Sequence, residues 1–157
     1  MKILLTGANG YIGSRLATIL INKGHSQTSH LRDPKMIHLA PELIQKITEI
    51  QADLLNPLSL KNIPEDIDIA YYLVHSMAHP KEDFQILDQQ AAEHFKNRMD
   101  ETSCKQIIYL SGIQDTTKKS KHLQSRFEVE AILSKAKAPL TVLRAAIIIG
   151  SGSASFE

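Results

Sequence analysis

The sequence predicts an α/β domain built on one doubly wound parallel β-sheet. Short runs rich in aliphatic residues alternate along the chain with longer stretches in which apolar residues recur three and four positions apart. A glycine-rich turn joins the first of these runs to the first helical stretch. The chain has 157 residues, 43% of them hydrophobic and 22% charged, which is typical of one globular domain.

Six runs have the length of buried strands. Most are apolar, as expected for a sheet covered on both faces, whereas the second is polar and is identified by its position more than by its composition. The predicted strands are Lys2–Thr6, Ser26–Leu31, Ile47–Gln51, Ile67–Val74, Gln106–Ser111 and Leu140–Ile149. Six strands with five crossovers give the order 3-2-1-4-5-6 if every connection is right-handed.

Five stretches between the strands have helical periodicity. The predicted helices are Tyr11–Lys23, Met36–Gln45, Pro57–Asn62, Asp83–Asp100 and Lys121–Lys137. Gly24 ends the first of them, and Pro139 marks the joint before the last strand. Because each helix connects two parallel strands, we expect helices on both faces of the sheet.

Composition excludes several classes of function. Eighteen Lys and Arg against 17 Asp and Glu give a net charge of +1, and the basic run Lys118–Lys121 is short, so we expect no nucleic-acid partner. No apolar run approaches the roughly 18 residues of a membrane span, and the first residues do not resemble a secretory leader. We therefore expect a cytoplasmic protein with no membrane partner.

Cysteine and histidine usage argues against disulfides and metal. Cys104 is the one cysteine, so the chain cannot form an intrachain disulfide, and a buried structural role is expected for it. His75 and His79 are four residues apart, but Pro80 and the loop context make a shared helical face improbable. We predict no metal site.

The strongest motif is a glycine-rich loop placed directly after the first strand. Its first glycine permits a tight turn, the second lets the backbone approach a pyrophosphate, and the third lets the helix pack closely on the sheet. The start of the helix then offers free N–H groups to an anion. The predicted loop residues are Gly7, Ala8, Asn9, Gly10, Tyr11, Ile12 and Gly13.

This loop resembles that of the extended and atypical short-chain dehydrogenase/reductases, a group with a Rossmann-type fold that includes NAD(P)-dependent epimerases and NmrA-like proteins. The resemblance continues in order through Leu31-Arg32-Asp33-Pro34, Ala52-Asp53-Leu54-Leu55, Val74-His75-Ser76-Met77, Tyr109-Leu110-Ser111-Gly112 and Leu143-Arg144-Ala145-Ala146. It implies a dinucleotide-binding domain over residues 1–150. Residues 151–157 are then interpreted as the start of a missing C-terminal segment, or alternatively as an ordinary frayed tail.

The choice of dinucleotide is expected to be made after the second strand. A carboxylate there would accept from the ribose 2′-OH of NAD, whereas a guanidinium would bind the 2′-phosphate of NADP, and the chain offers both in Arg32 and Asp33. The resemblance favours Arg32 and therefore NADP, with NAD as the alternative. Arg15 is a second candidate cation or simply an exposed helical side chain.

Two further segments are expected to contact the dinucleotide. By resemblance, Asp53 would accept from the adenine amine while Leu54 packs on the ring; the alternative role for Asp53 is to cap the short helix after it. Val74 and His75, at the carboxyl end of the fourth strand, would line the ribose and nicotinamide side of the cleft.

The resemblance also places a catalytic site, which departs from the family pattern. Catalytic members use a Tyr-x-x-x-Lys pair for proton transfer, but here His122 and Arg126 occupy those positions. Ser111 matches the family's substrate-polarising serine, and His122 is a candidate proton donor. The alternative interpretation of His122 is that it belongs to the basic, solvated start of a helix.

Three functions remain open from the sequence. The first is an NADP-preferring oxidoreductase or epimerase acting on a small carbonyl or hydroxyl substrate that the sequence does not identify. The second is a non-catalytic module that senses NADP, and the third is an inactive fragment. If a C-terminal segment is missing, apolar surface is expected near the sixth strand and the Asp83–Asp100 helix, and self-association into a homo-oligomer is then expected.

Overall fold

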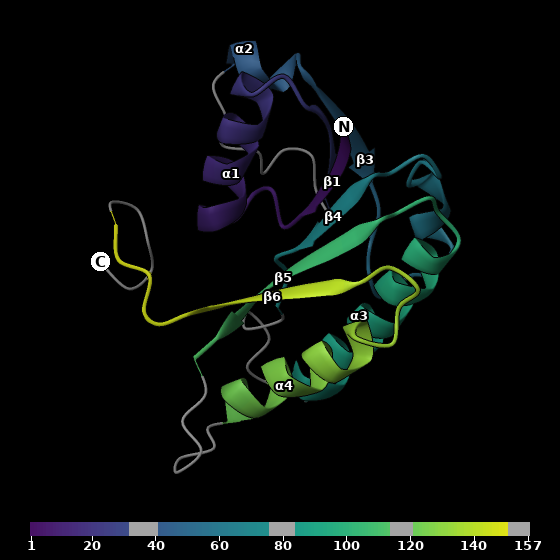
Figure 1. The fold of residues 1–157 in the computed structure, drawn as a ribbon, viewed down its shortest axis with the longest axis vertical. Coiled ribbons are helices and arrows are strands. Elements are labelled where there is room, and N and C mark those ends of the chain that lie inside the picture. The colour runs from purple at the N-terminus through teal and green to yellow at the C-terminus, as the bar shows by residue number, and fades with distance from the viewer. Residues whose placement is uncertain (32–40, 76–83, 114–120, 151–157) are drawn as a thin grey trace.

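Six parallel strands form the single sheet around which the chain folds. The computed structural model describes residues 1–31, 41–75, 84–113 and 121–150. The strands are β1 Lys2–Thr6, β2 Ser26–Leu31, β3 Ile47–Gln51, β4 Ile69–Tyr72, β5 Gln106–Gly112 and β6 Leu140–Ala145. Their order is β3-β2-β1-β4-β5-β6, which confirms the predicted doubly wound topology (Figure 1).

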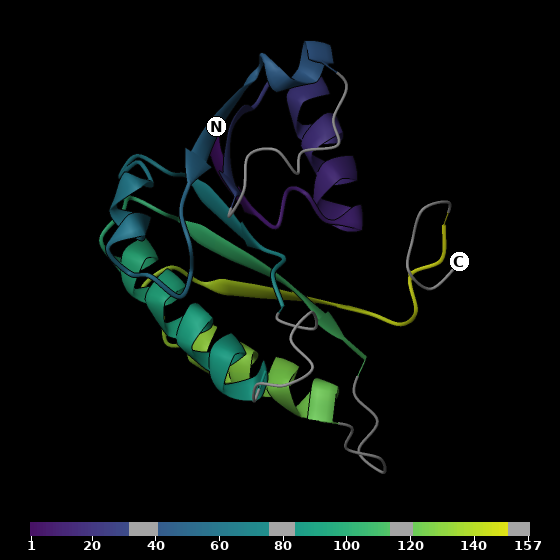
Figure 2. The same ribbon diagram turned by 180° about the vertical axis from the view of Figure 1, so that it is seen from behind.

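Helices cover both faces of the sheet, as predicted. They are α1 Tyr11–Asn22, α2 Pro41–Ile44, the 3₁₀ helix η2 Ser59–Asn62, α3 Phe84–Asp100 and α4 Lys121–Leu133. Helix α1 lies on one face, whereas α3 and α4 run side by side on the other (Figures 1 and 2). The helix that follows β1 thus lies on the face opposite to the helices that follow β4 and β5, as a doubly wound sheet requires.

The larger hydrophobic core lies between the sheet and the α3–α4 pair. Residues Ala91, Ala92, Phe95 and Met99 recur at helical spacing and are all buried on α3. The Tyr72 ring on β4 packs edge-on against Phe95 with centroids 4.9 Å apart. A smaller core lies beneath α1 and consists of the buried side chains Leu5, Ala8 and Ala17.

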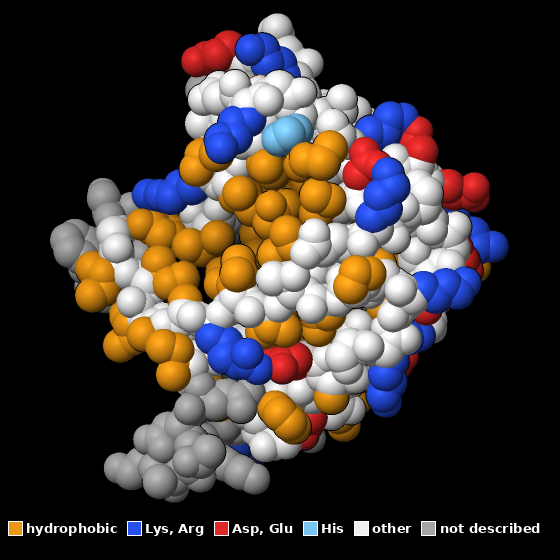
Figure 3. Space-filling view, in the orientation of Figure 1, with side chains coloured by type: hydrophobic (Ala, Val, Ile, Leu, Met, Phe, Trp, Pro, Cys, Tyr) orange, Lys and Arg blue, Asp and Glu red, His pale blue; other side chains and the backbone are white. Residues whose placement is uncertain are grey.

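The opposite face of β4, β5 and β6 carries an apolar groove beside α1. The groove has a volume of about 380 Å³ and is lined by residues of α1 and of these strands, Leu143 of β6 among them. Figure 3 shows apolar side chains gathered in this region, between α1 and the segment that follows β6. Leu143 and Ile147 are 51% and 75% exposed, so this face offers hydrophobic surface to solvent.

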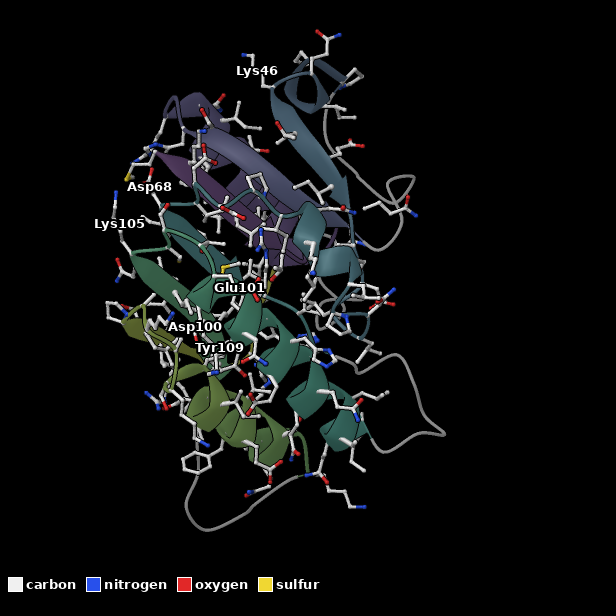
Figure 4. All side chains as sticks on the ribbon, turned by 90° about the vertical axis from the view of Figure 1, so that its right-hand side faces the viewer. Lys46, Asp68, Asp100, Glu101, Lys105 and Tyr109 are labelled. Atoms are coloured by element: carbon white, nitrogen blue, oxygen red, sulfur yellow. The ribbon has the colours of Figure 1, made fainter. Side chains whose placement is uncertain are left out.

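Charged side chains hold the amino ends of the central strands together. The Asp68 carboxylate accepts from the Lys2 backbone N–H at 2.9 Å and from Lys105 Nζ at 2.7 Å. Figure 4 shows Asp68 and Lys105 next to each other at this edge of the sheet. The hydrogen bond from Lys105 lowers the pKa of Asp68. These contacts lie at the amino ends of the strands, whereas the glycine loop lies at the opposite, carboxyl edge of the sheet.

Three predicted elements are clearly shorter than expected, and two of them end for a local reason. Strand β6 stops at Ala145 and not at Ile149, because Gly112 is the last residue of β5 with which it pairs. Helix α4 stops at Leu133, where the N–H of Ala136 bonds to Leu133 O in a tighter turn before Pro139. The predicted fourth strand, Ile67–Val74, is reduced to Ile69–Tyr72.

The two remaining short helices also differ from prediction. The stretch Pro57–Asn62 forms only the 3₁₀ turn η2, whose backbone bonds span three residues. The predicted helix Met36–Gln45 lies partly outside the described residues, and its described part contains α2. The polar second strand, by contrast, is present with its predicted bounds and pairs with both neighbours.

Candidate functional site

The glycine loop makes two close approaches that exclude side chains. Gly7 has φ +70°, and a Cβ there would lie 2.9 Å from the carbonyl oxygen of Leu73 on the neighbouring segment. At Gly13 a Cβ would overlap the Gly7 carbonyl oxygen and would lie 2.8 Å from the Ala8 Cα. The first turn of α1 is thus pressed against the loop, which leaves its N–H groups directed at the sheet's carboxyl edge.

Thr6 fixes the crevice beside this loop. Its buried hydroxyl donates to the Tyr71 carbonyl oxygen at 2.9 Å and accepts from the Leu73 N–H at 3.2 Å. The last residue of β1 is therefore tied to the end of β4 by two hydrogen bonds. Strands β1 and β4 are the pair at which the strand order reverses, which is where doubly wound sheets bind their ligands.

A cavity of about 310 Å³ opens at this edge and joins residues that the sequence places far apart. It extends from the glycine loop to the carboxyl ends of β4, β5 and β6 and includes one side chain from α4. The predicted site residues that line it are Gly7, Gly10, Tyr11, Ile12, Gly13, His75, Ser111 and Arg126. The cofactor loop and the catalytic candidates on β5 and α4 thus share one cavity.

Other predicted cofactor residues lie outside the lining. Ala8 is 1% exposed and packs in the small core beneath α1, Asn9 is half-buried, and Val74 packs against the larger core. Arg32, the predicted ligand of a 2′-phosphate, lies outside the described residues, as does Asp33. Dinucleotide selectivity is therefore not decided by the described geometry.

Hydrogen bonds hold the loop after β3, which contains the two predicted adenine contacts Asp53 and Leu54. Asp53 Oδ1 accepts from the Leu55 N–H at 3.0 Å, and the Ser59 hydroxyl bonds to both the N–H and the carbonyl oxygen of Asp53. Leu54 is only 4% exposed, so it offers little surface to a ring. Asp53 does not cap η2, since its carboxylate bonds within its own loop.

Sequence reasoning missed His94, which anchors this loop from α3. Its Nδ1 lies 2.7 Å from the Leu54 carbonyl oxygen. A carbonyl oxygen can only accept, so Nδ1 carries the proton and donates. Forty residues separate the two partners, and no pattern in the sequence signals their contact.

The catalytic candidates occupy the β5 side of the cavity. Ser111 is 1% exposed on β5, and Arg126 is half-buried on α4. Gly112 allows α4 to pack closely on the end of β5: a Cβ there would lie only 3.1 Å from a Leu123 methyl group, and in ordinary contact, 3.8 Å, with Arg126 Nη1. The side chain of His122 lies outside what the structure describes, so its proposed proton transfer is untested.

Tyr109 lies beneath these two residues and was not predicted to belong to the site. Its hydroxyl donates to the Arg126 carbonyl oxygen at 3.3 Å. Burial raises the pKa of Tyr109 to about 12, against the opposing effects of the Arg126 charge and of the Ser111 hydroxyl. The tyrosine therefore stays protonated at neutral pH and holds this turn of α4 against β5.

Two other sequence hypotheses concern charge and metal. Arg15 stacks on the Tyr11 ring, 3.7 Å from its centroid, and lines the apolar groove and not the cavity. Among the described residues, no group of three or more His, Cys, Asp or Glu side chains is arranged to hold a metal ion. No helix within the described part of the chain is long and apolar enough to cross a membrane.

The sheet order, the glycine loop and the cavity at the reversal point define a dinucleotide-binding domain of the Rossmann type. The chain belongs to the NAD(P)H-binding family, whose model matches residues 7–148. This assignment confirms the resemblance to the NAD(P)-binding short-chain dehydrogenase/reductases. No curated protein matches the chain.

Solved structures of low identity share the fold. The chain is similar to a nucleoside-diphosphate-sugar epimerase from Staphylococcus aureus, with 18% identity, a TM-score of 0.75, and coverage of 92% of this chain and 50% of that one. The chain is also similar to the Bordetella bronchiseptica enzyme WbmH in complex with NAD⁺, with 15% identity and a TM-score of 0.77, and the match covers 95% of this chain and 56% of that one. A triphenylmethane reductase from Citrobacter sp. has 18% identity and a TM-score of 0.75, and the match covers 94% of this chain and 50% of that one. The chain thus spans about half the length of these relatives.

Proposed function

We propose that the protein is an NADP-preferring oxidoreductase or epimerase of the short-chain dehydrogenase/reductase superfamily with an atypical active site. Its substrate would be a small molecule with a carbonyl or hydroxyl group. The observation that carries the proposal is the single cavity that joins Gly7, Gly10 and Gly13 to Ser111 and Arg126. A dinucleotide bound at the loop would extend toward groups able to bind a substrate oxygen.

The residues of the cavity fit a dinucleotide. Gly13 has no side chain, so the first turn of α1 packs closely on the loop. The backbone N–H groups of this turn and of the loop glycines would hold the pyrophosphate. Asp53 would accept from the adenine amine, and Arg32 would bind the 2′-phosphate of NADP. The nicotinamide ring, when bound, supplies or accepts a hydride.

The chain's own residues would then orient the substrate and move a proton. The Ser111 hydroxyl would donate to an oxygen of the substrate, because it has no hydrogen-bond partner among the described residues. His122 is the proposed proton donor, because an ordinary imidazole titrates near neutral pH. Buried side chains of the larger core support the β5 side of the cavity and keep it rigid.

A non-catalytic NADP-sensing module is the second candidate. The observation that favours it is the replacement of the Tyr-x-x-x-Lys pair by His122 and Arg126. Tyr109, Tyr71 and Tyr72 are fixed on strands, and Tyr109 uses its hydroxyl on the Arg126 backbone. A sensor would bind the nucleotide through the same loop but would show no turnover.

Calorimetric titration with NADP and NAD tests the binding step. We expect NADP to bind more tightly than NAD, and Arg32→Ala to reduce NADP affinity by about 1–3 kcal/mol, which is the value of a charge-assisted contact. Arg144→Ala is the matched control, because Arg144 pairs with Glu130 away from the cavity. Equal losses for NADP and NAD in Arg32→Ala would contradict the proposed selectivity.

Turnover separates the two candidates. NADPH oxidation would be followed with a panel of small aldehydes and ketones, using the wild-type chain and Ser111→Ala. The enzyme hypothesis predicts activity that Ser111→Ala reduces by two orders of magnitude or so while NADP still binds. Tight NADP binding without turnover of any panel member would favour the sensor.

A further inference from the structure

The β5 side of the cavity has the features of an anion site separate from the glycine loop. Strand β4 lies between β1, which leads into the loop, and β5, which carries Ser111. Neighbouring strands are about 4.8 Å apart, so two steps across the sheet separate these ends by about 10 Å. An anion bound near Ser111 would therefore not be the pyrophosphate held by the loop.

The charge of the cavity is positive at this end. Among the described residues that line the cavity, Arg126 has the one permanently charged side chain, and none is acidic. Its guanidinium makes no ion pair with any carboxylate in the described part of the chain. A half-buried arginine that faces a cavity and has no counter-ion within the described residues favours an anionic ligand.

Ser111 supplies an independent observation. Its hydroxyl is buried, and it forms no hydrogen bond of normal distance and angle with a described residue, although it lies near enough to Tyr109 to influence that hydroxyl. A buried hydroxyl without a partner costs stability unless a ligand satisfies it. Ser111 and Arg126 line the same cavity, and Tyr109 lies next to both, since its hydroxyl donates to the Arg126 carbonyl oxygen and is close to the Ser111 side chain.

The arginine is also held in place from below. The Tyr109 hydroxyl bonds to the Arg126 carbonyl oxygen and so fixes the backbone of this turn of α4. Most other lining residues on this side, such as Leu110 and Ile148, are apolar and strengthen electrostatic contacts by excluding water. The backbone that carries Arg126 is thus fixed, and its side chain lies in mainly apolar surroundings.

We propose that Arg126 and Ser111 bind an oxyanionic group of the substrate, a carboxylate or a phosphate, at the β5 end of the cavity. This inference rests on the proposed function, because it names the class of substrate that the same site would take. The guanidinium supplies a planar pair of donors that matches two oxygens, and the serine hydroxyl supplies a third donor. A neutral analogue of the substrate would leave the arginine charge uncompensated.

The test measures anion binding directly. Ligand-observed NMR titrations would use pyruvate, inorganic phosphate and the neutral ester methyl pyruvate, each with nucleotide-free protein and with NADP-saturated protein. We expect pyruvate or phosphate to bind in both states and methyl pyruvate to bind at least tenfold more weakly. Whichever of the two anions binds more tightly identifies the group.

Three variants assign the site. Arg126→Gln should weaken anion binding about tenfold or more, Arg126→Lys should restore part of it, and Arg144→Gln, which removes a surface arginine, should leave it unchanged. Ser111→Ala should weaken binding about fivefold without lowering Tm, since it removes a buried hydroxyl that lacks a protein partner. A merely structural serine would lower Tm and leave anion affinity unchanged.

The outcomes are distinct from those of the proposed function. Three results would each overturn the inference while NADP binding stands. Arg126→Gln could bind both anions as tightly as the wild type does, methyl pyruvate could bind as tightly as pyruvate, or NADP saturation could abolish anion binding. If neither nucleotide binds, the proposed function fails. The difference between Arg126→Gln and nucleotide-free wild type then still decides the anion site.

Discussion

Replacement of Gly13 with alanine is the sharpest test of the glycine loop, because α1 leaves no room for a side chain there. The new Cβ would overlap the Gly7 carbonyl oxygen and lie 2.8 Å from the Ala8 Cα, and backbone atoms cannot rotate away. In an open helix the same change would stabilise by about 1 kcal/mol. Overpacking costs up to about 3 kcal/mol, so we expect a net loss of about 2 kcal/mol. For a chain of this size, that lowers Tm by about 4–8 °C.

Thermal unfolding and calorimetric titration with NADP would be measured on Gly13→Ala and on a matched control. In the control, Gly24→Ala, the residue has φ +76° but nothing lies within 4 Å of its Cβ, so only backbone strain of about 1–2 kcal/mol is expected. Both variants should therefore lose Tm, whereas Gly13→Ala alone should lose at least tenfold in NADP affinity. Wild-type affinity in Gly13→Ala would refute the role of the loop, and a wild-type Tm would refute the close packing.

Three other predictions address burial and association. Burial raises the pKa of Tyr72 and brings that of Tyr109 to about 12, so the native state keeps protons that the unfolded state releases above pH about 10. Above that pH the free energy of unfolding should fall by about 1.4 kcal/mol per pH unit per tyrosine. The Tyr109→Phe variant should therefore show a smaller slope of Tm against pH than the wild type. Burial also raises the pKa of the Cys104 thiol, so iodoacetamide should alkylate it slowly at pH 8 and rapidly in concentrated guanidinium chloride; equal rates would contradict this. Exposed Leu143 and Ile147 predict self-association by light scattering that Leu143→Lys weakens, and a wild-type monomer at high concentration would exclude it.

The order of the sheet could be predicted because it follows from local pattern and from handedness. Six strand-length runs separated by helical periodicity leave few right-handed arrangements, and the polar run among them, Ser26–Leu31, is predicted by its position between two helical stretches. Element ends were less predictable, since tertiary contacts decide them. The sequence from Ala146 to Ile149 has strand character, but β5 provides no pairing partner beyond Gly112.

The glycine loop was predictable for the same reason as the sheet, because its function depends on backbone shape that only glycine allows at Gly7 and Gly13. The supports of the site were not. The Thr6 hydroxyl bonds to Tyr71 on β4 and to Leu73 just after it, 65 and 67 positions away, and His94 reaches the Leu54 carbonyl across 40 positions. Such contacts depend on which strands the fold makes neighbours, so a single sequence carries no local signal for them.

The two ends of the cavity rest on cores of different size, which has a consequence for ligand binding. Ser111 and Arg126 are backed by the large core between the sheet and the α3–α4 pair, whereas the glycine loop rests on Leu5, Ala8 and Ala17. Local opening requires less free energy where fewer apolar contacts are buried, so α1 should open more readily than α4. A nucleotide at a hundred times its Kd adds about 2.7 kcal/mol to the folded state. Amide exchange in α1 should therefore slow more than in α4 when NADP binds, and equal protection of both helices would show that the two halves open as one unit.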